Sequence, residues 1–249
     1  MSGREAGKSR LLEGRAALVT GAAKRIGRTL ALALAGEGAR VAVHHHRSAE
    51  EAEETARLAG NGARTFRADL SSVAEAEGLA EDVHRAFGRI DVVIHNAALF
   101  GRTPFGETTE RDWDRFHAVN LKAPFFLSQA AAARMGEGSI LFIADVCALD
   151  PWPGYLAYGA TKAGLIHLTR GLARALAPRI RVNAILPGPI LPSEPEGAES
   201  LDEAVARTLL KRRGDPSDIA SAALFLTAEA CYVTGAVLPV DGGRHLGSR

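Results

Sequence analysis

Three ionisable side chains lie close enough together in the sequence to suggest proton transfer. Tyr158 and Lys162 are four residues apart, a spacing that places both side chains on one face of a helix. The lysine charge can lower the pKa of the phenol from about 10 towards the working range. Asp145 precedes Tyr158 by thirteen residues and can add a carboxyl group to the same site. The trio predicts a catalytic site that handles protons, and the carboxyl restricts which substrates fit.

The elements that must position these residues follow a βαβ pattern, in which short apolar runs alternate with longer helical stretches. The predicted strands are Ala16–Val19, Arg40–His44, Arg64–Arg67, Val92–His95, Ser139–Ile143, Arg181–Leu186 and Val237–Val240. The predicted helices are Ile26–Gly36, Ala49–Leu58, Val73–Phe87, Glu110–Arg134, Tyr158–Ala177 and Pro216–Thr227. This order predicts an α/β doubly wound Rossmann fold, with a seven-stranded parallel sheet and helices on both faces.

The length of 249 residues fits a single domain. Residues 1–13 are charged and lack the apolar run of a secretory signal, so we expect a flexible tail before a catalytic domain over 14–249. No apolar segment reaches the roughly 18 residues that a membrane span needs. The Pro- and Gly-rich segment Pro187–Pro195 follows the sixth strand, at the sheet edge that holds ligands in such folds. We therefore expect a substrate loop over about 187–212 that acts as a lid.

The composition gives no sign of a macromolecular partner. The 30 Lys and Arg residues balance 29 Asp and Glu residues, so electrostatics favour neither nucleic acid nor an anionic membrane. Cys147 and Cys231 form no CxxC pair and have no neighbours at metal-ligand spacing, which predicts neither a disulfide framework nor a zinc site. We expect a cytoplasmic protein with a small-molecule partner and no metal.

The segment Thr20–Gly27 follows the first predicted strand and leads into a helix. In this context a glycine-containing turn offers backbone N–H groups and a helix N-terminus to a diphosphate. Arg25 stands where such a turn usually has glycine. Its guanidinium can bind a phosphate or the substrate, and an ordinary basic residue at a helix start is the alternative.

The segment His44–Ser48 leaves the second strand about 20 residues after the glycines. At this place an NAD-binding protein normally has an acid for the ribose 2′-hydroxyl, whereas an NADP-binding protein has arginine. Arg47 can bind a 2′-phosphate, and Ser48 and His46 can donate to it. NADPH is therefore predicted over NADH. A metal site made of the histidines is disfavoured, because consecutive residues point in different directions.

Seven short motifs in the right order resemble the short-chain dehydrogenase/reductase family over nearly the whole chain. They are Thr20-Gly-x-x-x-x-x-Gly27, Asp69-Leu70, Asn96-Ala-Ala98, Asn120, Tyr158-x-x-x-Lys162, Pro187-Gly188 and Asp241-Gly-Gly243. The serine of this family is replaced by Asp145. Together with Thr-Gly-Ala-Ala-Lys-Arg, His46-Arg-Ser48 and Gly154-Tyr-x-x-Tyr158, this aspartate resembles the pteridine reductases, including bacterial dihydromonapterin reductases.

The resemblance implies roles for many residues. Lys162 would bind the nicotinamide ribose and polarise Tyr158, while Asn120 would hold a water or a backbone group that keeps the proton path connected. The implied catalytic residues are Asp145, Tyr158, Lys162 and Asn120. The implied NADPH-binding residues are Gly21, Lys24, Arg25, Ile26, Gly27, His46, Arg47, Ser48, Asp69, Leu70, Asn96, Ala97, Tyr158, Lys162, Pro187, Gly188 and Ile190.

The implied reaction is hydride transfer to a C=N bond of a dihydropteridine, while a ring nitrogen receives a proton. An ionised Asp145 would repel the alkoxide formed from a ketone. With a ring imine as the acceptor, the carboxyl group can instead carry a proton, or accept a hydrogen bond from an N–H of the heterocycle. Phe100 would stack on the pterin, with a core phenylalanine as the alternative. The predicted substrate-binding residues are Arg25, Phe100, Asp145, Tyr158, Trp152 and Leu191, with Tyr155 and Pro192 as further walls or as packing residues.

Two other functions stay open. An NADPH-dependent carbonyl reductase of the 3-oxoacyl type would tolerate or gain from Asp145→Ser, whereas a pteridine reductase would lose activity. A non-catalytic NADP-binding regulator would need no phenol beside an ammonium. Cys147 is interpreted as a small pocket filler, since nothing near it in the sequence would activate a thiol. The sequence does not choose among biopterin, monapterin, neopterin and folate.

The family resemblance also suggests a homotetramer formed by the helices around Glu110–Arg134 and Tyr158–Ala177. Their apolar residues exceed what one core-facing stripe requires. They include Phe125, Phe126, Leu165, Leu168 and Leu172. The C-terminal residues Arg244–Arg249 are placed where they could reach the pocket of a neighbouring subunit.

Overall fold

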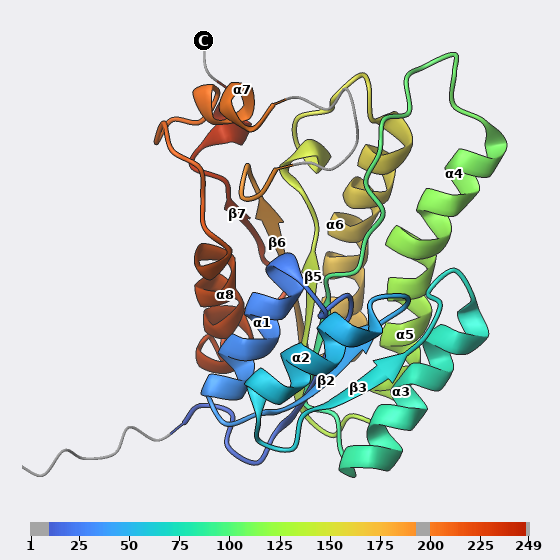
Figure 1. Cartoon of the computed structure of the whole chain (residues 1–249), viewed down its shortest axis with the longest axis vertical. Coiled ribbons are helices and arrows are strands. Elements are labelled where there is room, and N and C mark those ends of the chain that lie inside the picture. Colours follow the sequence, from blue (N-terminus) through green and yellow to red (C-terminus); the bar gives the residue numbers. More distant parts are fainter. Residues whose placement is uncertain (1–9, 193–199, 248–249) are drawn as a thin grey trace, which may run out of the picture.

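Seven parallel strands form the centre of the molecule (Figure 1). The computed structural model describes residues 10–192 and 200–247. Within them the strands are β1 (Ala16–Val19), β2 (Arg40–His45), β3 (Arg64–Arg67), β4 (Val92–His95), β5 (Gly138–Ile143), β6 (Ile180–Pro187) and β7 (Val237–Val240). Their order in space is β3-β2-β1-β4-β5-β6-β7, so the chain starts in the middle of the sheet and winds outwards in both directions. The predicted single-domain Rossmann fold is confirmed.

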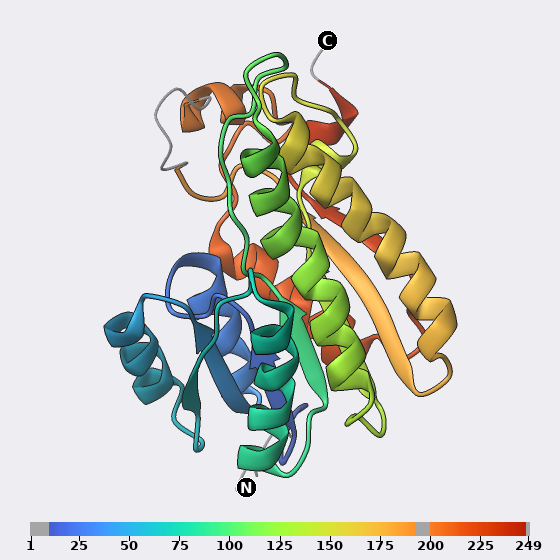
Figure 2. The ribbon, with the colours of Figure 1, turned by 90° about the vertical axis from the view of Figure 1, so that its right-hand side faces the viewer.

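Helices cover both faces of the sheet, because its central strands are apolar on both sides. In β1 all the residues are buried. One face carries α1 (Arg25–Gly36), α2 (Ala49–Ala59) and α8 (Pro216–Leu224). The other carries α3 (Val73–Phe87), α5 (Ala123–Ala132) and α6 (Leu156–Leu176), which Figure 2 presents to the viewer.

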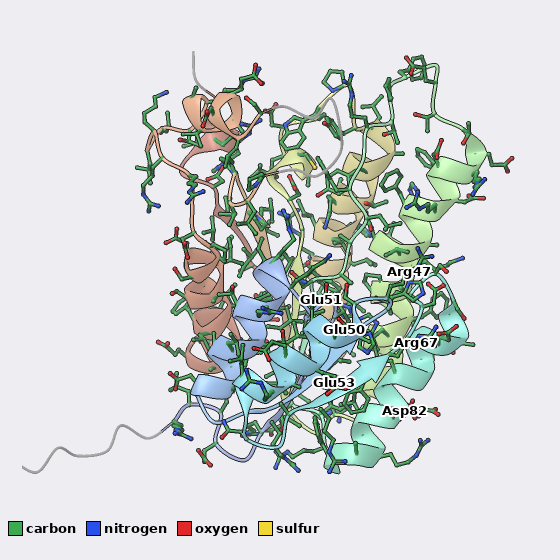
Figure 3. All side chains as sticks on the ribbon, viewed as in Figure 1. Arg47, Glu50, Glu51, Glu53, Arg67 and Asp82 are labelled. Atoms are coloured by element: carbon green, nitrogen blue, oxygen red, sulfur yellow. The ribbon has the colours of Figure 1, made fainter. Side chains whose placement is uncertain are left out.

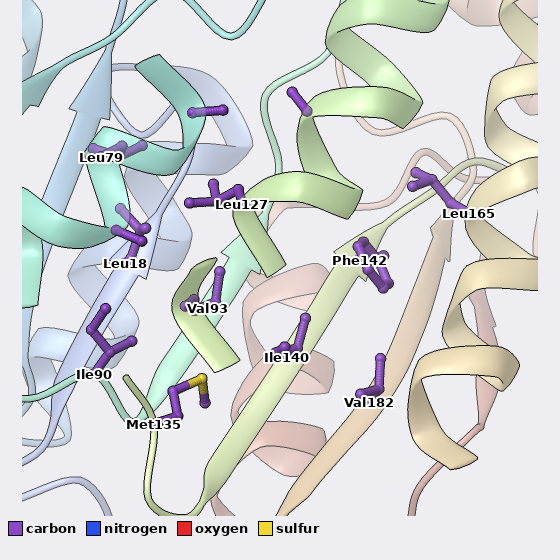
Figure 4. Packing of buried hydrophobic residues seen from close by; sticks show 14 of the residues in the cluster. Leu18, Leu79, Ile90, Val93, Leu127, Met135, Ile140, Phe142, Leu165 and Val182 are labelled. Atoms are coloured by element: carbon purple, nitrogen blue, oxygen red, sulfur yellow. The ribbon is translucent and has the colours of Figure 1, made fainter. Parts of the chain in front are cut away.

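The larger apolar cluster lies between the sheet and the helices α3, α5 and α6. Leu18, Ile140 and Phe142 are fully buried on the strands, and Leu127 and Leu165 approach them from the helices (Figure 4). Each such side chain contributes roughly 1.5–3 kcal/mol when it is fully buried. This packing fixes the carboxyl ends of the strands, where the candidate site is built.

The long helix predicted over Glu110–Arg134 is interrupted. It begins as α4 (Glu110–His117), passes through a π-helical turn, η1 (Ala118–Lys122), and ends as α5 at Ala132. Pro124 lies in the first turn of α5. Because proline has no backbone N–H for the helical ladder, it accounts for a change of helix geometry at this point. Such π turns are frequent at functional sites, and η1 contains Asn120.

The last predicted helix, Pro216–Thr227, is also divided. Its α-helical part, α8, ends at Leu224 and continues as a second π-helical turn, η3 (Phe225–Glu229). The helix predicted from Tyr158 begins two residues earlier, at Leu156, so Tyr158 lies in its first turn.

The chain ends differ from the sequence prediction. Of the tail predicted over 1–13, residues 1–9 lie outside the described part, whereas 10–13 form a turn in which Leu12 is buried and donates its N–H to the Glu37 carbonyl at 2.9 Å.

The substrate loop predicted over 187–212 contains a short helix, α7 (Leu201–Ala206), which begins with a capping box of Ser200 and Glu203. Its residues 193–199 lie outside the described part. In the described ranges, no helix combines the length and apolarity needed to cross a membrane.

Candidate active site

A cavity of about 1110 Å³ opens at the carboxyl edge of the sheet. Its walls come from the turn after β1, the loops after β4 and β5, the first turns of α6 and the segments after β6. Most predicted site residues line it: Gly21, Lys24, Arg25, Ile26, Gly27, Asn96, Ala97, Phe100, Asp145, Trp152, Tyr155, Tyr158, Lys162, Pro187, Gly188, Ile190 and Leu191. Residues separated by up to 170 positions are thus brought to one site.

The remaining predicted residues do not line this cavity. They are His46, Arg47, Ser48, Asp69, Leu70, Asn120 and Pro192. Four of them follow β2 and β3 near the same edge of the sheet, whereas Leu70 is buried in the core. Asn120 and Pro192 are hydrogen-bonded to residues that line the cavity, Asn120 to Leu99 and Pro192 to Arg25.

Tyr158 and Asp145 are directly bonded. The phenol O–H of Tyr158 donates to Asp145 Oδ2 at 2.8 Å. Asp145 Oδ1 accepts the backbone N–H of Cys147 at 2.8 Å, so the aspartate caps a short 3₁₀ turn, η2 (Val146–Ala148), that follows β5. One carboxyl group therefore fixes the local backbone and holds the phenol.

Lys162 lies one turn further along α6 and donates its ammonium to the Ile143 carbonyl at 3.0 Å. Its Nζ is 5.5 Å from the centre of the Tyr158 ring. The predicted placement of the phenol and the ammonium on one helix face is confirmed. Tyr158 is held through Asp145 and Lys162 through the Ile143 carbonyl, both at the end of β5, and both residues line the cavity.

The predicted fall in the pKa of Tyr158 is wrong. Burial raises the pKa of the phenol well above 10, and the charge of Asp145 raises it further. Burial also lowers the pKa of Lys162. The sequence showed the helical spacing to the lysine but not the depth of burial or the direct bond to a carboxyl. The phenol is therefore held in its protonated form.

Asn120 holds a backbone group, one of the two partners that were expected. Its Oδ1 accepts the Leu99 N–H at 2.8 Å, and its Nδ2 donates to the Leu99 carbonyl at 2.9 Å. A longer contact of 3.4 Å joins Nδ2 to the hydroxyl of Thr161, between Tyr158 and Lys162 on α6. The buried amide thus fixes the loop after β4 to the catalytic helix.

Aromatic rings form one wall of the cavity. Phe100 stacks on Tyr155 with ring centres 5.1 Å apart, and it meets Tyr158 edge-on at 4.9 Å. Trp152 meets Tyr155 edge-on at 5.8 Å. Phe100 packs on other rings and also lines the cavity, and its stacking on a pterin stays a prediction. A flat apolar wall of this kind suits a planar substrate.

The turn after β1 has the features of a phosphate cradle. A Cβ on Gly27 would lie 2.1 Å from the Gly21 carbonyl oxygen, so only glycine fits there. Asn96 Nδ2 donates to the carbonyls of Thr20 and Gly21 and fixes the turn. α1 begins here without a side-chain cap, which leaves its first N–H groups for a ligand.

Arg25 occupies the left-handed backbone region, with φ of 55°. This conformation explains why glycine is usual at the position, and a non-glycine residue adopts it at a cost of order 1 kcal/mol. The guanidinium donates to the Pro192 carbonyl at 2.8 Å. Arg25 therefore joins the candidate phosphate turn to the segment after β6.

His44 is a site residue that the sequence analysis missed. Its Nδ1 accepts the N–H of Gly21 at 3.0 Å, and its Nε2 lies 3.1 Å from the Ala68 carbonyl. The two contacts require a neutral ring with the proton on Nε2, and burial lowers the pKa of His44 to about 4. A histidine in a buried strand was the available signal, but it was considered only as a metal ligand. Among the described residues, no group of three His, Cys, Asp or Glu side chains could hold a metal ion.

The buried imidazoles predict sensitivity to acid. Burial lowers the pKa of His44 to about 4 and that of His95, bonded to Ser128, to about 3, from an ordinary value of 6.5. Below pH 6.5 these histidines bind protons in the unfolded chain but stay neutral in the folded chain, so the free energy of unfolding falls as the pH decreases. At pH 4 the loss from His44 alone is about 3 kcal/mol.

Urea unfolding between pH 7 and pH 4 measures this effect. The slope of stability against pH should be shallower in His44→Gln than in the wild-type protein. Equal slopes in the two proteins would contradict the assignment.

The residues after β2 lie beside the first turn of α2. Arg47 is exposed, and Ser48 is the residue before the helix. The side chains of Arg47 and of Glu50 and Glu51 in the first turn of α2 are shown in Figure 3. His46 Nε2 is 3.7 Å from Asp69, and the Asp69 Oδ1 accepts from Ser71. These bonds to Ser71 lower the pKa of Asp69.

Comparison with known proteins identifies the family. The family described as enoyl-(acyl carrier protein) reductase matches residues 21–245. A 3-oxoacyl-[acyl-carrier-protein] reductase of Staphylococcus aureus is 35% identical over 242 residues, which cover 93% of this chain and 98% of the relative.

Solved structures agree with this result. A short-chain dehydrogenase/reductase from Serratia marcescens superposes with a TM-score of 0.89 at 34% identity, covering 94% of this chain and 99% of that one. The alternative dihydrofolate reductase 1 from Brucella canis, complexed with NADP, has a TM-score of 0.90 at 33% identity, covering 97% and 98%. On the family match, the sequence identity to relatives and the shared fold, the chain belongs to the short-chain dehydrogenase/reductase family and is an oxidoreductase of that family.

Proposed function

We propose that this protein is an NADPH-dependent reductase of dihydropteridines. The observation that carries the proposal is the bond from Tyr158 to Asp145, which puts a carboxylate where an alkoxide would have to form from a ketone. A ring imine develops no such negative oxygen, and its N–H groups can donate to a carboxylate. The similarity to an alternative dihydrofolate reductase supports the same substrate class.

The cofactor of the proposal is NADPH, and the geometry of the cavity fits it. The phosphates would lie against the first turn of α1, with Gly21 and Gly27 leaving room for them. Pro187, Gly188 and Lys162 line the same cavity, and the nicotinamide and its ribose would be held beside them. Bound NADPH supplies the hydride for the reaction.

The side chains of this protein would supply the proton. Because burial and Asp145 keep the pKa of Tyr158 high, the phenol carries a proton that it can donate to a ring nitrogen. Lys162, 5.5 Å from the ring centre, stabilises the phenolate that remains. Asp145 holds the phenol in position and can accept from a second N–H of the substrate.

An NADPH oxidation assay tests the proposal. Purified protein should oxidise NADPH with dihydrobiopterin, dihydromonapterin or dihydrofolate, and tetrahydro products should be found by chromatography. A 3-oxoacyl thioester is the comparison substrate. Turnover of the thioester without turnover of any dihydropterin would disprove the pteridine function.

A carbonyl reductase of the 3-oxoacyl type is the second candidate. The relative from Staphylococcus aureus favours it, because that enzyme is named for this reaction and aligns over nearly its whole length. Against it stands the carboxylate of Asp145 at the phenol. The two candidates predict opposite results for the serine variant considered in the Discussion.

The preference for NADPH over NADH should depend on Arg47. Arg47→Gln removes a charge that can form a forked contact with the 2′-phosphate, so KM for NADPH should rise roughly tenfold, whereas KM for NADH should change little. Steady-state kinetics with both nucleotides measure this. Arg67→Gln, an exposed arginine at the end of β3, serves as the control. An equal rise for both nucleotides would place Arg47 outside the 2′-phosphate site.

We further propose a homotetramer, in which the helical segment from α4 through η1 to α5 and the helix α6 pack against copies of themselves. An apolar groove supports this arrangement and includes Leu121, Phe125, Phe126 and Leu168. Leu165, which the sequence placed in this interface, is instead buried in the core.

A charge placed in the groove should weaken the assembly. We expect Phe126→Glu to lower the mass measured by light scattering, because a carboxylate would be buried between subunits. Leu58→Glu, on the exposed side of α2, should keep the wild-type mass. A monomeric wild-type protein at micromolar concentration would refute the tetramer.

A further inference from the structure

The loop between β2 and α2 is attached on both of its sides to the turn after β1. This loop covers residues 46–48, contains Arg47 and is called the 46–48 loop below. On its first side, the carbonyl of His44 in β2 accepts the N–H of Ala22 in the turn at 2.9 Å. On its second side, α2 lies beside α1 on the same face of the sheet (Figure 1). The loop is therefore closed at its base by the turn suited to a diphosphate.

Two side chains make the attachment to α2, namely Arg28 of α1 and Thr55 of α2. Both reach the carbonyl oxygen of Ala23 in the turn: Arg28 Nε donates to it at 3.1 Å, and the Thr55 hydroxyl lies 2.9 Å from it. Arg28 Nε is also 2.8 Å from the Thr55 hydroxyl, and Arg28 Nη2 donates to the Glu51 carbonyl at 3.2 Å. The Thr55 hydroxyl lies 2.9 Å from the same Glu51 carbonyl, so its one proton serves either carbonyl.

This network is shielded from water. Thr55 and Ala23 are buried, and Arg28 is half-buried. A hydrogen bond from a guanidinium is stronger than one between neutral groups, and a buried carbonyl that loses its donors is left unsatisfied. The network therefore resists any movement of the turn relative to α2.

The two ends of the network touch two different parts of the candidate cofactor site. The peptide unit is planar and trans, so the N–H of Lys24 points opposite to the Ala23 carbonyl and hence away from α2. Lys24 lines the cavity and directly precedes α1. At the other end, Glu51 lies in the first turn of α2, directly after the 46–48 loop. Arg28 and Thr55 thus join an N–H group suited to a diphosphate to the helix that carries this loop.

We propose that Arg28 and Thr55 are positioning residues, which fix the spacing between the turn after β1 and the 46–48 loop and thereby strengthen the selection of NADPH over NADH. NADPH has a phosphate on the ribose 2′-oxygen, which NADH lacks. A ligand that binds at both places gains from a fixed spacing, because less of the site must be ordered on binding. NADH gains only at the turn. This role rests on the 2′-phosphate site proposed at Arg47.

Calorimetric titration with NADPH and with NADH tests this role in the absence of any substrate. Thr55→Val removes the hydroxyl at nearly constant volume, and Arg28→Met removes the guanidinium but keeps an unbranched side chain. In each variant Kd for NADPH should rise about tenfold and Kd for NADH at most about twofold, as expected for coupled sites. The matched control is Thr227→Val, a buried threonine whose hydroxyl donates to the Ala223 carbonyl at 2.7 Å. It should leave both Kd values unchanged.

A double variant separates positioning from a general loss of structure. Because Thr55 would act through Arg47, adding Thr55→Val to Arg47→Gln should not lower the ratio of Kd for NADH to Kd for NADPH any further. Equal rises for both nucleotides, no rise for either, or additive effects in the double variant would overturn the positioning role.

The same titrations distinguish this role from the proposals on which it could depend. An unchanged ratio in Arg47→Gln alone would refute the 2′-phosphate site, and the positioning role with it. Failure to reduce any dihydropterin would refute the pteridine function and leave the selective loss of NADPH binding as evidence for the positioning role.

Discussion

Replacing Tyr158 with phenylalanine is expected to lower kcat by about 10²–10⁴-fold, the range that a positioned proton donor contributes. The phenol is 4% exposed, and its O–H donates to Asp145 at 2.8 Å, so few water molecules can replace it. The ring also packs edge-on against Phe100 at 4.9 Å, and phenylalanine keeps this contact. The loss should therefore fall on kcat, with little change in KM for NADPH. Stopped-flow and steady-state measurements of NADPH oxidation give both constants.

Tyr155 supplies the matched control for this variant. It is buried in the same cavity wall and stacks on Phe100, so Tyr155→Phe removes a phenol oxygen from the same surroundings. Its kcat should stay within about tenfold of the wild-type value. Comparable losses in the two variants would show that Tyr158 supports the pocket and does not donate the proton.

Asp145→Ser should reduce dihydropterin turnover by about 100-fold or more, because a serine hydroxyl cannot carry the proton or the charge of the carboxylate. The fold should tolerate the change. Serine is a good cap residue, so it can still accept from the Cys147 N–H that Asp145 now binds at 2.8 Å. Loss of the carboxylate also removes one cause of the high pKa of Tyr158. The alkaline limb of the pH–rate profile should therefore move to lower pH.

Asp145→Asn provides the comparison of equal size without the charge. A pteridine reductase should lose activity in both variants, whereas a 3-oxoacyl reductase should gain thioester turnover in the serine variant. Parallel assays with dihydrobiopterin and a 3-oxoacyl thioester measure the two outcomes. Undiminished dihydropterin turnover in the serine variant would show that Asp145 takes no part in the reaction.

The sheet was predictable because central parallel strands are apolar on both faces. Ala16–Val19 and Val92–His95 have the same bounds in the sequence prediction and in the structure. The interruption of the helix before Pro124 was less visible, since an apolar pattern continues through the π turn. A six-residue helix such as α7 is also too short to show periodicity against a Pro-rich background.

The cavity residues were mostly predictable because each motif follows a strand end, and strand ends meet at one edge of a parallel sheet. Properties set by distant packing were not. The raised pKa of Tyr158 depends on burial, and the bond from Gly21 to His44 joins the turn after β1 to the strand β2.

The bond from Arg25 to the Pro192 carbonyl links two parts of the candidate site that lie far apart in the sequence. One side chain belongs both to the turn suited to phosphates and to the segment suited to substrate. A ligand that repositions this guanidinium at one end changes the free energy of binding at the other, and thermodynamic reciprocity makes the coupling equal in both directions. A nucleotide and a substrate that both reposition Arg25 would therefore be coupled through a single side chain.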